Sequence, residues 1–456
     1  MTETTTGVPD YDDAAVARIH AFVETVTGGK IVRIERQVRW RPAWFADVEK
    51  DGEIIALHLR GDRAGDVAIF PDLKRESDII EVLTAHGVPA PKIYGYLADP
   101  PCIVMESIPG TRDLSGLPQE ALGSIGRDYM AAVAAMHAVP LDAFAAIGIH
   151  APETAEDIAL IGLNTYLPQY ARTKRRPEPL LEFVIGWLRR NVPKHRTKAS
   201  FVQFDSGQFL VKDGRLTKLY DFEFGMIGDP FVDIATMGMR NSIEPLGASL
   251  AELCLNYEAS TGEPVDHDVI LFHILQFSTL GTMQFTGTVA QPVPGDPHSV
   301  YIEWDLSLRK SMLLALSALT GVALPVLEPL AERTGDNVAL IAKLADTVTR
   351  IAPAAAIDEA QKEQAVQLIE ALARVDVMGG AAVARDITDV SAYLGRAFDE
   401  WPAAAAALEK HIQTAGPAED VALITLLGTI EGRRMQVYEP TAIAGSARDV
   451  VLPQTR

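Results

Sequence analysis

The first part of the chain shows the alternation of hydrophobic and polar side chains that is typical of β-strands. Three runs with this alternation lie within residues 30–60, and Asp51 and Gly52 separate the second run from the third. An Asp–Gly pair favours a tight hairpin turn, because both residue types tolerate a positive φ angle. We therefore expect three antiparallel strands, at residues 31–34, 44–48 and 54–59.

A helical pattern follows these strands. Residues 71–86 carry isoleucine and leucine side chains at helical spacing, and the Gly-Val-Pro-Ala-Pro run at residues 87–91 ends the helix. Two short β-like runs come next, at residues 93–96 and 102–105. The pattern predicts a five-stranded antiparallel sheet with one helix.

Beyond Glu106 the pattern becomes mainly helical. Residues 125–138 and 180–191 each carry an apolar face, and almost all of residues 336–438 do so as well. One predicted β-hairpin, at residues 209–220, interrupts the helices. We expect an α+β protein. Its predicted parts are an N-terminal lobe at residues 1–105, a C-terminal lobe at residues 106–325, a helical extension at residues 326–440 and a tail at residues 441–456.

Composition and charge narrow the partners that we expect. The 456 residues carry a net charge of -20, which disfavours nonspecific binding to nucleic acids and anionic membranes. Residues 1–13 lack the features of a secretory signal, and the longest apolar stretch, at residues 312–327, is interrupted and too short for a membrane span. Cys102 and Cys254 do not have the spacing of metal-binding cysteines, and we expect both thiols to lie in the core. We therefore predict a cytoplasmic protein with no nucleic-acid or membrane partner.

Candidate chemistry is concentrated around the predicted hairpin. Asp205 and Gln208 precede it, and Asp221 ends its second strand, so a loop and a strand end can converge on one point. Phosphoryl transfer requires one carboxylate that accepts or orients the substrate hydroxyl proton. It also requires an amide and a second carboxylate that hold Mg²⁺ across the nucleotide phosphates. Asp233 opens a later helix, and we expect it to accept N–H bonds from the Asp205 loop.

In this region the chain resembles the aminoglycoside phosphotransferase and choline kinase-like family, which has a protein-kinase-like two-lobe fold. Asp205, the Asp-Phe-Glu run at residues 221–223 and the Gly-Asp-Pro run at residues 228–230 followed by Asp233 match the family pattern in order. The resemblance covers roughly residues 31–305. It implies a small-molecule kinase that uses ATP and Mg²⁺.

The resemblance also implies individual roles. It makes Asp205 the catalytic base, Asp221 and Gln208 the Mg²⁺ ligands, Arg60 held by Glu76 the phosphate contact, and Met105 and Glu106 part of the nucleotide-binding hinge.

Two departures from the family pattern affect these expectations. Gln208 follows Asp205 by only three residues, so the catalytic loop is two residues shorter than in the family, and Gln203-Phe204 replace His-Gly. The segment at residues 37–48 lacks the glycines that would let the backbone approach phosphates. Its arginine and tryptophan side chains could grip phosphates or stack on adenine, and an amphipathic strand pair with solvated arginines fits equally well. These side chains are Arg39, Trp40, Arg41 and Trp44.

The sequence gives fewer indications of which compound accepts the phosphoryl group than of the reaction itself. Residues 172–198 contain nine basic and two acidic side chains, a local charge of +7, which favours an anionic acceptor. Further stretches resemble a branch of the family that is associated with acyl-CoA dehydrogenases and includes kinases of hydroxyacyl substrates. The alternatives are an aminoglycoside-type antibiotic kinase and a catalytically weak nucleotide-binding scaffold. The C-terminal helices are a candidate interface for a homo-oligomer.

Overall fold

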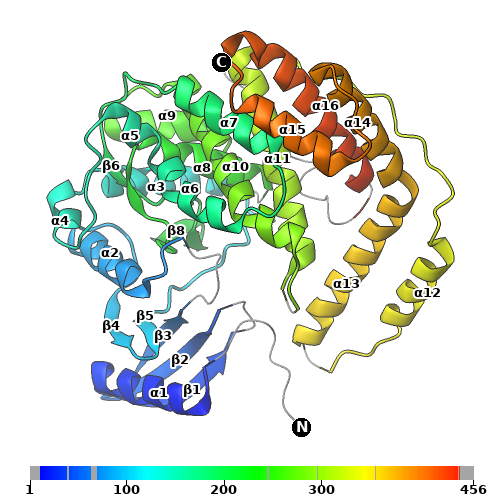
Figure 1. Cartoon of the computed structure of the whole chain (residues 1–456). Coiled ribbons are helices and arrows are strands. Elements are labelled where there is room, and N and C mark those ends of the chain that lie inside the picture. Colours follow the sequence, from blue (N-terminus) through cyan, green and yellow to red (C-terminus); the bar gives the residue numbers. More distant parts are fainter. Residues whose placement is uncertain are drawn as a thin grey trace. The chain divides into compact units, whose positions relative to one another are not determined.

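The computed structural model of the chain describes residues 11–37, 41–62, 69–243, 246–294, 296–354, 356–439 and 441 (Figure 1). Arg39, Trp40 and the tail beyond residue 441 lie outside the described residues.

The chain forms two compact units. The first unit holds the residues up to Ile161 together with Pro193–Ile270. The second unit holds Gly162–Val192 and continues from Leu271 onward. All the predicted site residues lie in the first unit, whereas the predicted domain boundaries stay a prediction.

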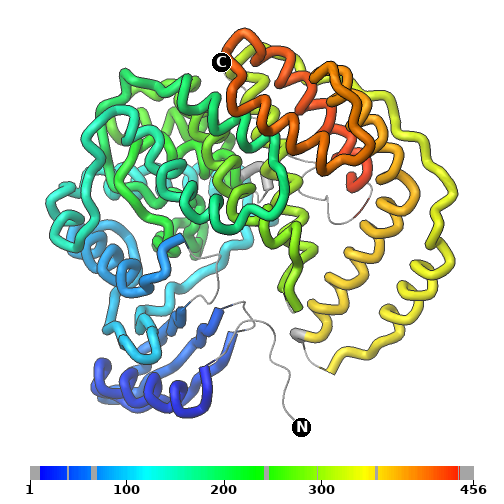
Figure 2. Tube along the Cα trace, in the orientation of Figure 1, coloured from blue at the N-terminus to red at the C-terminus, as the bar shows by residue number. Residues whose placement is uncertain are grey.

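The predicted five-stranded antiparallel sheet is confirmed, with the strand order β1-β2-β3-β5-β4. Figure 2 traces these strands in blue to cyan. Asp51 and Gly52 form the expected turn, with φ angles of 55° and 85°. The strands are β1 (Lys30–Arg36), β2 (Ala43–Lys50), β3 (Glu53–Gly61), β4 (Ile93–Ala98) and β5 (Pro101–Glu106).

Two helices cover opposite faces of this sheet. Helix α1 (Asp13–Thr27), which the sequence analysis does not predict, packs Ile19 and Val23 against a cluster that contains Val104. Helix α2 (Leu73–Ala85) packs Leu73 against Met105. Because neighbouring side chains of a strand point to opposite faces, β5 contributes to both cores.

The rest of the first unit is mainly helical. Strand β6 pairs with β9, β7 forms the predicted hairpin with β8, and α3 packs on α9 and β8. These elements are α3 (Gln119–His137), α4 (Leu141–Ala145), α5 (Ala155–Ala159), β6 (Ser200–Val202), β7 (Phe209–Lys212), β8 (Arg215–Leu219), β9 (Met226–Gly228), α8 (Phe231–Ile243) and α9 (Leu250–Thr261).

The second unit is built from helices, which confirms the helical character predicted for residues 336–438. Its helices are α6 (Ile161–Thr173), α7 (Pro179–Arg190), α10 (His267–Ala290), α11 (His298–Thr320), α12 (Val338–Thr349), α13 (Ala356–Arg374), the π-helical turn η1 (Val375–Gly379), α14 (Gly380–Leu394), α15 (Trp401–Ile412), the 3₁₀ turn η2 (Pro417–Glu419) and α16 (Asp420–Tyr438). Within the described part of the chain, no helix combines the length and apolar character that a membrane crossing requires.

A buried ionic network holds three helices of the second unit together. The Arg309 guanidinium on α11 lies 3.0 Å from Asp305, 2.6 Å from Glu178 at the start of α7, and 3.0 Å from Glu431 on α16. The arginine side chain is only 2% exposed. Removing one partner of such a network would leave an uncompensated buried charge, so the network fixes how these helices pack.

Candidate active site

Arg60, near the end of β3, connects the sheet to the segment that follows the β7–β8 hairpin. Its Nε lies 3.0 Å from Glu76 Oε2 on α2, and its Nη2 lies 2.6 Å from Asp221 Oδ1. Glu223 Oε2 lies 3.6 Å from the same nitrogen. The expected ion pair between Arg60 and Glu76 is therefore present, and the arginine is shared among three carboxylates.

Burial affects the two ends of this pair differently. Desolvation alone would lower the pKa of Arg60, but Asp221, Glu76 and Glu223 outweigh it and raise that pKa well above its usual range. Desolvation raises the pKa of Glu76 to about 7, because Arg60 also serves two other carboxylates and does not fully compensate Glu76. Glu76 also accepts a hydrogen bond from the Phe222 N–H at 3.2 Å.

The candidate base, Asp205, lies in the loop between β6 and β7. Gln208 Nε2 donates to Asp205 Oδ2 at 3.3 Å, and Arg240 on α8 forms an ion pair with the same carboxylate. Arg240 Nε also donates to the carbonyl oxygen of Ser206 at 2.9 Å. The arginine thus holds both the side chain and the backbone of this loop.

Asp233, at the start of α8, anchors the Asp205 loop as expected. Its carboxylate accepts the N–H groups of Gln203 and Phe204 at 3.0 and 2.8 Å, and the Ser206 hydroxyl at 2.7 Å. His137 Nε2 lies 2.9 Å from the same carboxylate. Asp233 is fully buried. These four contacts therefore satisfy a carboxylate that would be costly to bury alone.

Two residues without glycine's freedom adopt the left-handed backbone conformation here. Phe204 has a φ angle of 71° and Asp221 one of 63°. This region is unfavourable for a bulky side chain such as phenylalanine and is found where surrounding contacts impose it, often at active sites. Gln203 Nε2 reinforces the arrangement by donating to the carbonyl oxygens of Tyr220, at 2.6 Å, and Asp221, at 3.3 Å. Gln203 thus ties together the two segments that carry the candidate chemistry.

Gln208, the amide in the expected Mg²⁺ site, also contacts an arginine. Arg112 Nη1 lies 2.6 Å from Gln208 Oε1 and 2.6 Å from the Tyr220 hydroxyl. The oxygen donors of Gln208 and Asp221 suit Mg²⁺, which proteins commonly hold with one or two side chains plus nucleotide phosphates. Across the described residues there is no group of three or more His, Cys, Asp or Glu side chains that could hold a metal ion.

The two expected hinge residues contact neighbouring parts of the sheet, and Glu106 also contacts the β7–β8 hairpin. Met105 is buried against Leu73 and Ile103. The Glu106 side chain accepts the Lys92 N–H at 3.0 Å and forms an ion pair with Lys218. Their predicted contact with a nucleotide stays a prediction.

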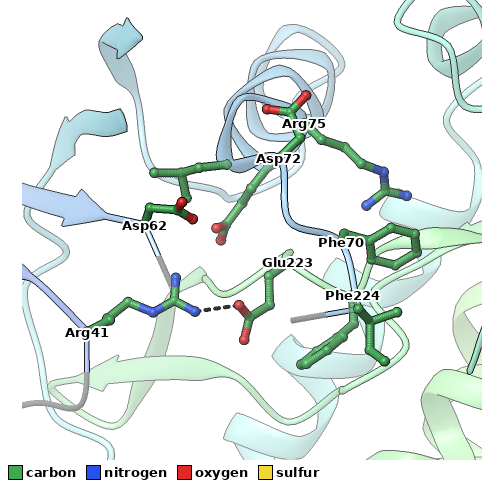
Figure 3. Close-up of a pocket in the computed structure, with 10 residues that line it drawn as sticks. Arg41, Asp62, Phe70, Asp72, Arg75, Glu223 and Phe224 are labelled. Carbon is green, nitrogen blue, oxygen red and sulfur yellow. Dashed lines mark hydrogen bonds and ion pairs between the residues drawn. The ribbon is translucent and has the colours of Figure 1, made fainter. Parts of the chain in front are cut away.

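The structure describes two of the four side chains considered at residues 37–48, and both are buried. Trp44 is buried in the core between the sheet and α1, so it does not present a face for adenine stacking. Arg41 is not solvated: it is 4% exposed and forms an ion pair with Glu223, as Figure 3 shows. A small pocket with Phe70, Arg75 and Phe224 in its wall adjoins this pair.

The basic segment at residues 172–198 is much less available to an anion than its local charge of +7 suggests. Five of its nine basic side chains form ion pairs with acidic residues of their own unit. These pairs are Lys174 with Glu182 and Glu409, Arg176 with Glu178, Arg190 with Asp420, Arg196 with Asp229 and Glu263, and Lys198 with Glu263. The sequence argument for an anionic acceptor therefore loses much of its electrostatic basis.

The sequence analysis did not single out Arg112 and Arg240, although both contact the candidate chemistry. Arg112 lies 96 positions from Gln208, and Arg240 lies 35 positions from Asp205. No local spacing connects such pairs, so no pattern in a single sequence marks them. Glu223, in contrast, is marked in the sequence as the last residue of the Asp-Phe-Glu run.

The contacts described above lie almost entirely within one matched segment. Residues 44–266 match the phosphotransferase enzyme family. The matched segment contains Arg60, Glu76, Asp205, Gln208 and Asp221, and the predicted α+β, protein-kinase-like fold is confirmed. The narrower resemblance to the branch associated with acyl-CoA dehydrogenases stays a prediction.

Comparisons with whole proteins give more distant likenesses. No curated protein matches the chain. Among solved structures, macrolide 2′-phosphotransferase MphH from Brachybacterium faecium is 18% identical, with 67% of this chain and 98% of that chain covered and a TM-score of 0.45. The streptomycin–ATP complex of APH(2″)-IIa is 14% identical, with 60% and 90% covered and a TM-score of 0.44. ADP-bound APH(2″)-Ib is 13% identical, with 61% and 92% covered and a TM-score of 0.45.

Asp233→Ala should release the Asp205 loop. Because the substitution leaves two buried N–H groups and a hydroxyl without their acceptor, we expect a loss of about 3 kcal/mol or more in local stability. Amide hydrogen exchange at residues 203–206 should accelerate on the order of 10²-fold. Asp78→Ala, which removes a surface pair with Lys74, is the control and should leave this exchange unchanged. Unaltered protection in Asp233→Ala would show that the carboxylate does not anchor the loop.

The raised pKa of Glu76 gives stability a defined pH dependence. A carboxyl whose pKa rises on folding from 4.5 to about 7 stabilises the fold below pH 4.5, and this contribution is lost as the pH rises through 7. Relative to wild type, Glu76→Gln should therefore gain stability between pH 5 and 7.5, by roughly 1–3 kcal/mol.

Urea unfolding of both proteins across this pH range measures the difference. Burial also raises the pKa of Asp386 to about 7, but Asp386 contributes equally to both proteins, so the comparison isolates Glu76. A pH-independent difference between wild type and Glu76→Gln would mean that Glu76 stays ionised throughout.

Proposed function

We propose that the first unit is an ATP-dependent phosphotransferase that transfers the γ-phosphoryl group to a hydroxyl of a small molecule. The observation that supports this most is that the Gln203 side chain ties the Asp205 loop to Asp221, which pairs with Arg60, inside the segment that matches the phosphotransferase family. These groups supply a proton acceptor, oxygen donors for a metal and a cation for phosphates, which are the parts that phosphoryl transfer needs.

In this proposal Asp205 accepts the proton of the acceptor hydroxyl. The hydroxyl oxygen then bonds to the γ-phosphorus, the bond from that phosphorus to the bridging oxygen breaks, and ADP leaves with the electron pair. Gln208 and Arg240 hold the Asp205 carboxylate in place for this step. Positioning of the base is a large part of such catalysis, because the protein forms no covalent intermediate.

The nucleotide would lie against the arginine and hinge residues. Arg60, oriented by Glu76, would contact the phosphates, and Met105 and Glu106 would border the base. Asp221 and Gln208 would hold Mg²⁺, which neutralises phosphate charge when bound. The acceptor in this proposal is a small, anionic compound that carries a hydroxyl group.

One observation favours a nucleotide-binding scaffold as the second candidate. Asp205, Gln208 and Asp221 each contact an arginine, namely Arg240, Arg112 and Arg60. These arginines occupy oxygen atoms that the proton transfer and the metal would use, so the contacts would slow turnover. Measured turnover distinguishes the two candidates.

Asp205→Asn should remove the proton acceptor while keeping the shape of the side chain. We expect kcat to fall by roughly 10²-fold or more, with ATP binding little changed. Coupled assays of ADP release, with chemically diverse hydroxyl compounds as acceptors, give the wild-type turnover with which the variant is compared. Asp213→Asn, in the exposed β7–β8 turn, is the matched control, and its activity should equal that of wild type. An Asp205→Asn enzyme with wild-type turnover would refute the assignment of the base.

Asp221→Asn tests the metal role with a residue that tolerates the positive φ angle at this position. At 100 times Kd, Mg-ATP should stabilise wild type by about 2.7 kcal/mol. A tenfold weaker affinity in the variant reduces this to about 1.4 kcal/mol at the same concentration.

Unfolding titrations with ATP, in the presence of Mg²⁺ and of EDTA, measure both values. If the variant retains all of the Mg²⁺-dependent stabilisation by ATP, Asp221 is not the metal ligand. If ATP does not stabilise the wild type at all, that result would contradict the proposed function itself.

A further inference from the structure

Helix α12 in the second unit is apolar but almost uncovered. Eight of its 12 residues, all of them described, are alanine, valine, leucine or isoleucine, yet Ile341 alone is buried. Among the described elements, α12 packs against α13 (Figure 1), and Asn337 at its start donates twice to the Asp376 carboxylate of η1, each time at 3.0 Å. An apolar helix of a globular protein normally buries its apolar face, so α12 presents surface that a second molecule can cover.

The exposed apolar side chains of α12 form one line along the helix, the α12 strip. Leu340 is 69% exposed, Leu344 44% and Ile351, just beyond the end of the helix, 55%. With the exposed Thr347 they are spaced by four, three and four residues, which is the spacing of the seam in a two-stranded coiled coil. Ile341 lies about a quarter of a turn from this strip on a helix of about 3.6 residues per turn, so the contact between α12 and α13 leaves the strip open.

The charge around the α12 strip suits a second copy of the chain. Residues 336–351 contain two acidic and two basic side chains, so this segment is neutral in a chain whose net charge is -20. Two copies of so acidic a protein repel each other over most of their surfaces, and a neutral apolar segment is where they can approach. The net charge also disfavours an anionic membrane as the surface that covers the strip.

The order of the charges makes this segment complementary to itself. Asp336, Lys343 and Arg350 recur at every seventh residue and therefore lie along one flank of the α12 strip. In an antiparallel pair related by a two-fold axis, Leu344 of each copy packs against Leu340 of the other, and Asp336 then lies opposite Arg350 of the second copy. Asp336 is 79% exposed and Arg350 is 77% exposed, so both side chains can reach such a partner.

Ion pairs within α12 are compatible with this pairing. Asp346 lies 2.9 Å from Lys343, which limits the repulsion between the two copies of Lys343 near the two-fold axis. Asp346 also lies 2.8 Å from Arg350, whose several N–H donors can serve Asp336 of the second copy as well. A shift by one heptad in one direction would oppose Lys343 and Arg350, and the opposite shift would leave Leu344 without a leucine partner. The charges and the leucines therefore select the same register.

We propose that α12 is the seam of a homodimer, in which the α12 strips of two copies pack antiparallel about a two-fold axis. The proposal narrows the interface expected for the C-terminal helices to one helix and one register. It concerns the second unit and does not rest on the proposed phosphotransferase function.

Sedimentation of the full chain over a concentration range of about 1–100 µM tests the dimer. We expect the wild type to change from monomer to dimer across this range. Leu340→Gln combined with Leu344→Gln removes the apolar seam and keeps good helix formers, so the dissociation constant of the dimer should rise at least about tenfold. Val421→Gln is the matched control, because it changes a similarly exposed apolar side chain, 62% exposed on α16, and should leave dimerisation unchanged.

An exchange of charges tests the antiparallel register. Asp336→Arg alone, or Arg350→Glu alone, places like charges opposite each other at both ends of the seam, so each should weaken the dimer several-fold. The two substitutions together exchange the signs and should restore most of the wild-type affinity. Because all of the altered side chains are exposed, the circular dichroism of each variant should equal that of the wild type.

The same measurements show whether the inference is wrong. A wild type that stays monomeric at every concentration, or a dimer that the leucine substitutions do not weaken, would overturn it. If the combined Asp336→Arg and Arg350→Glu variant does not recover affinity, the antiparallel register is excluded. A monomeric wild type that binds phosphatidylcholine vesicles through the same leucines would assign the strip to a lipid surface instead. A wild type that Mg-ATP does not stabilise would contradict the proposed function alone and leave the dimer intact.

Discussion

The buried carboxylate of Asp233 is the constraint on which the candidate active site depends. It accepts the N–H groups of two consecutive residues, Gln203 and Phe204, and therefore dictates the backbone path into Asp205. The unfavourable φ angle of Phe204 follows from this path, and the buried phenyl ring offsets part of its cost. Because the anchor is on α8, the base is positioned by a helix of the core rather than by its own loop.

A second constraint comes from Arg60, which joins the sheet to the strand end at Asp221. The guanidinium cannot lose its charge, so the surrounding carboxylates adjust to it. Asp221 takes the shortest contact, and Glu76 becomes easier to protonate because burial costs it more than the shared arginine returns. The same arrangement directs Arg60 at the partly exposed carboxylate of Asp221.

The sequence predicts the parts of this protein that depend on local pattern. Alternating side chains and Asp-Gly turns located the sheet and the β7–β8 hairpin, and the order of the acidic motifs located Asp205, Asp221 and Asp233. It did not predict contacts that lie outside these motifs. Arg112 and Arg240 have no local signature, and the charge of residues 172–198 is balanced by partners such as Glu263 and Glu409 that lie far along the chain. Trp44 shows the same limit, because its alternation fits a core position and a ligand contact equally well.

The two units contain similar ionic clusters that differ in their exposure to solvent. Arg60 and Arg309 are both buried arginines, each shared by three carboxylates. Around Arg309 the partner side chains are at most 10% exposed, so the charges compensate one another and only fix helix packing. Around Arg60 two partners remain reachable, with Asp221 24% and Glu223 17% exposed. The Arg60 cluster is therefore open to solvent at two carboxylates, whereas the Arg309 cluster is closed. Accessibility, rather than the presence of a perturbed buried charge, distinguishes a candidate site from a structural network.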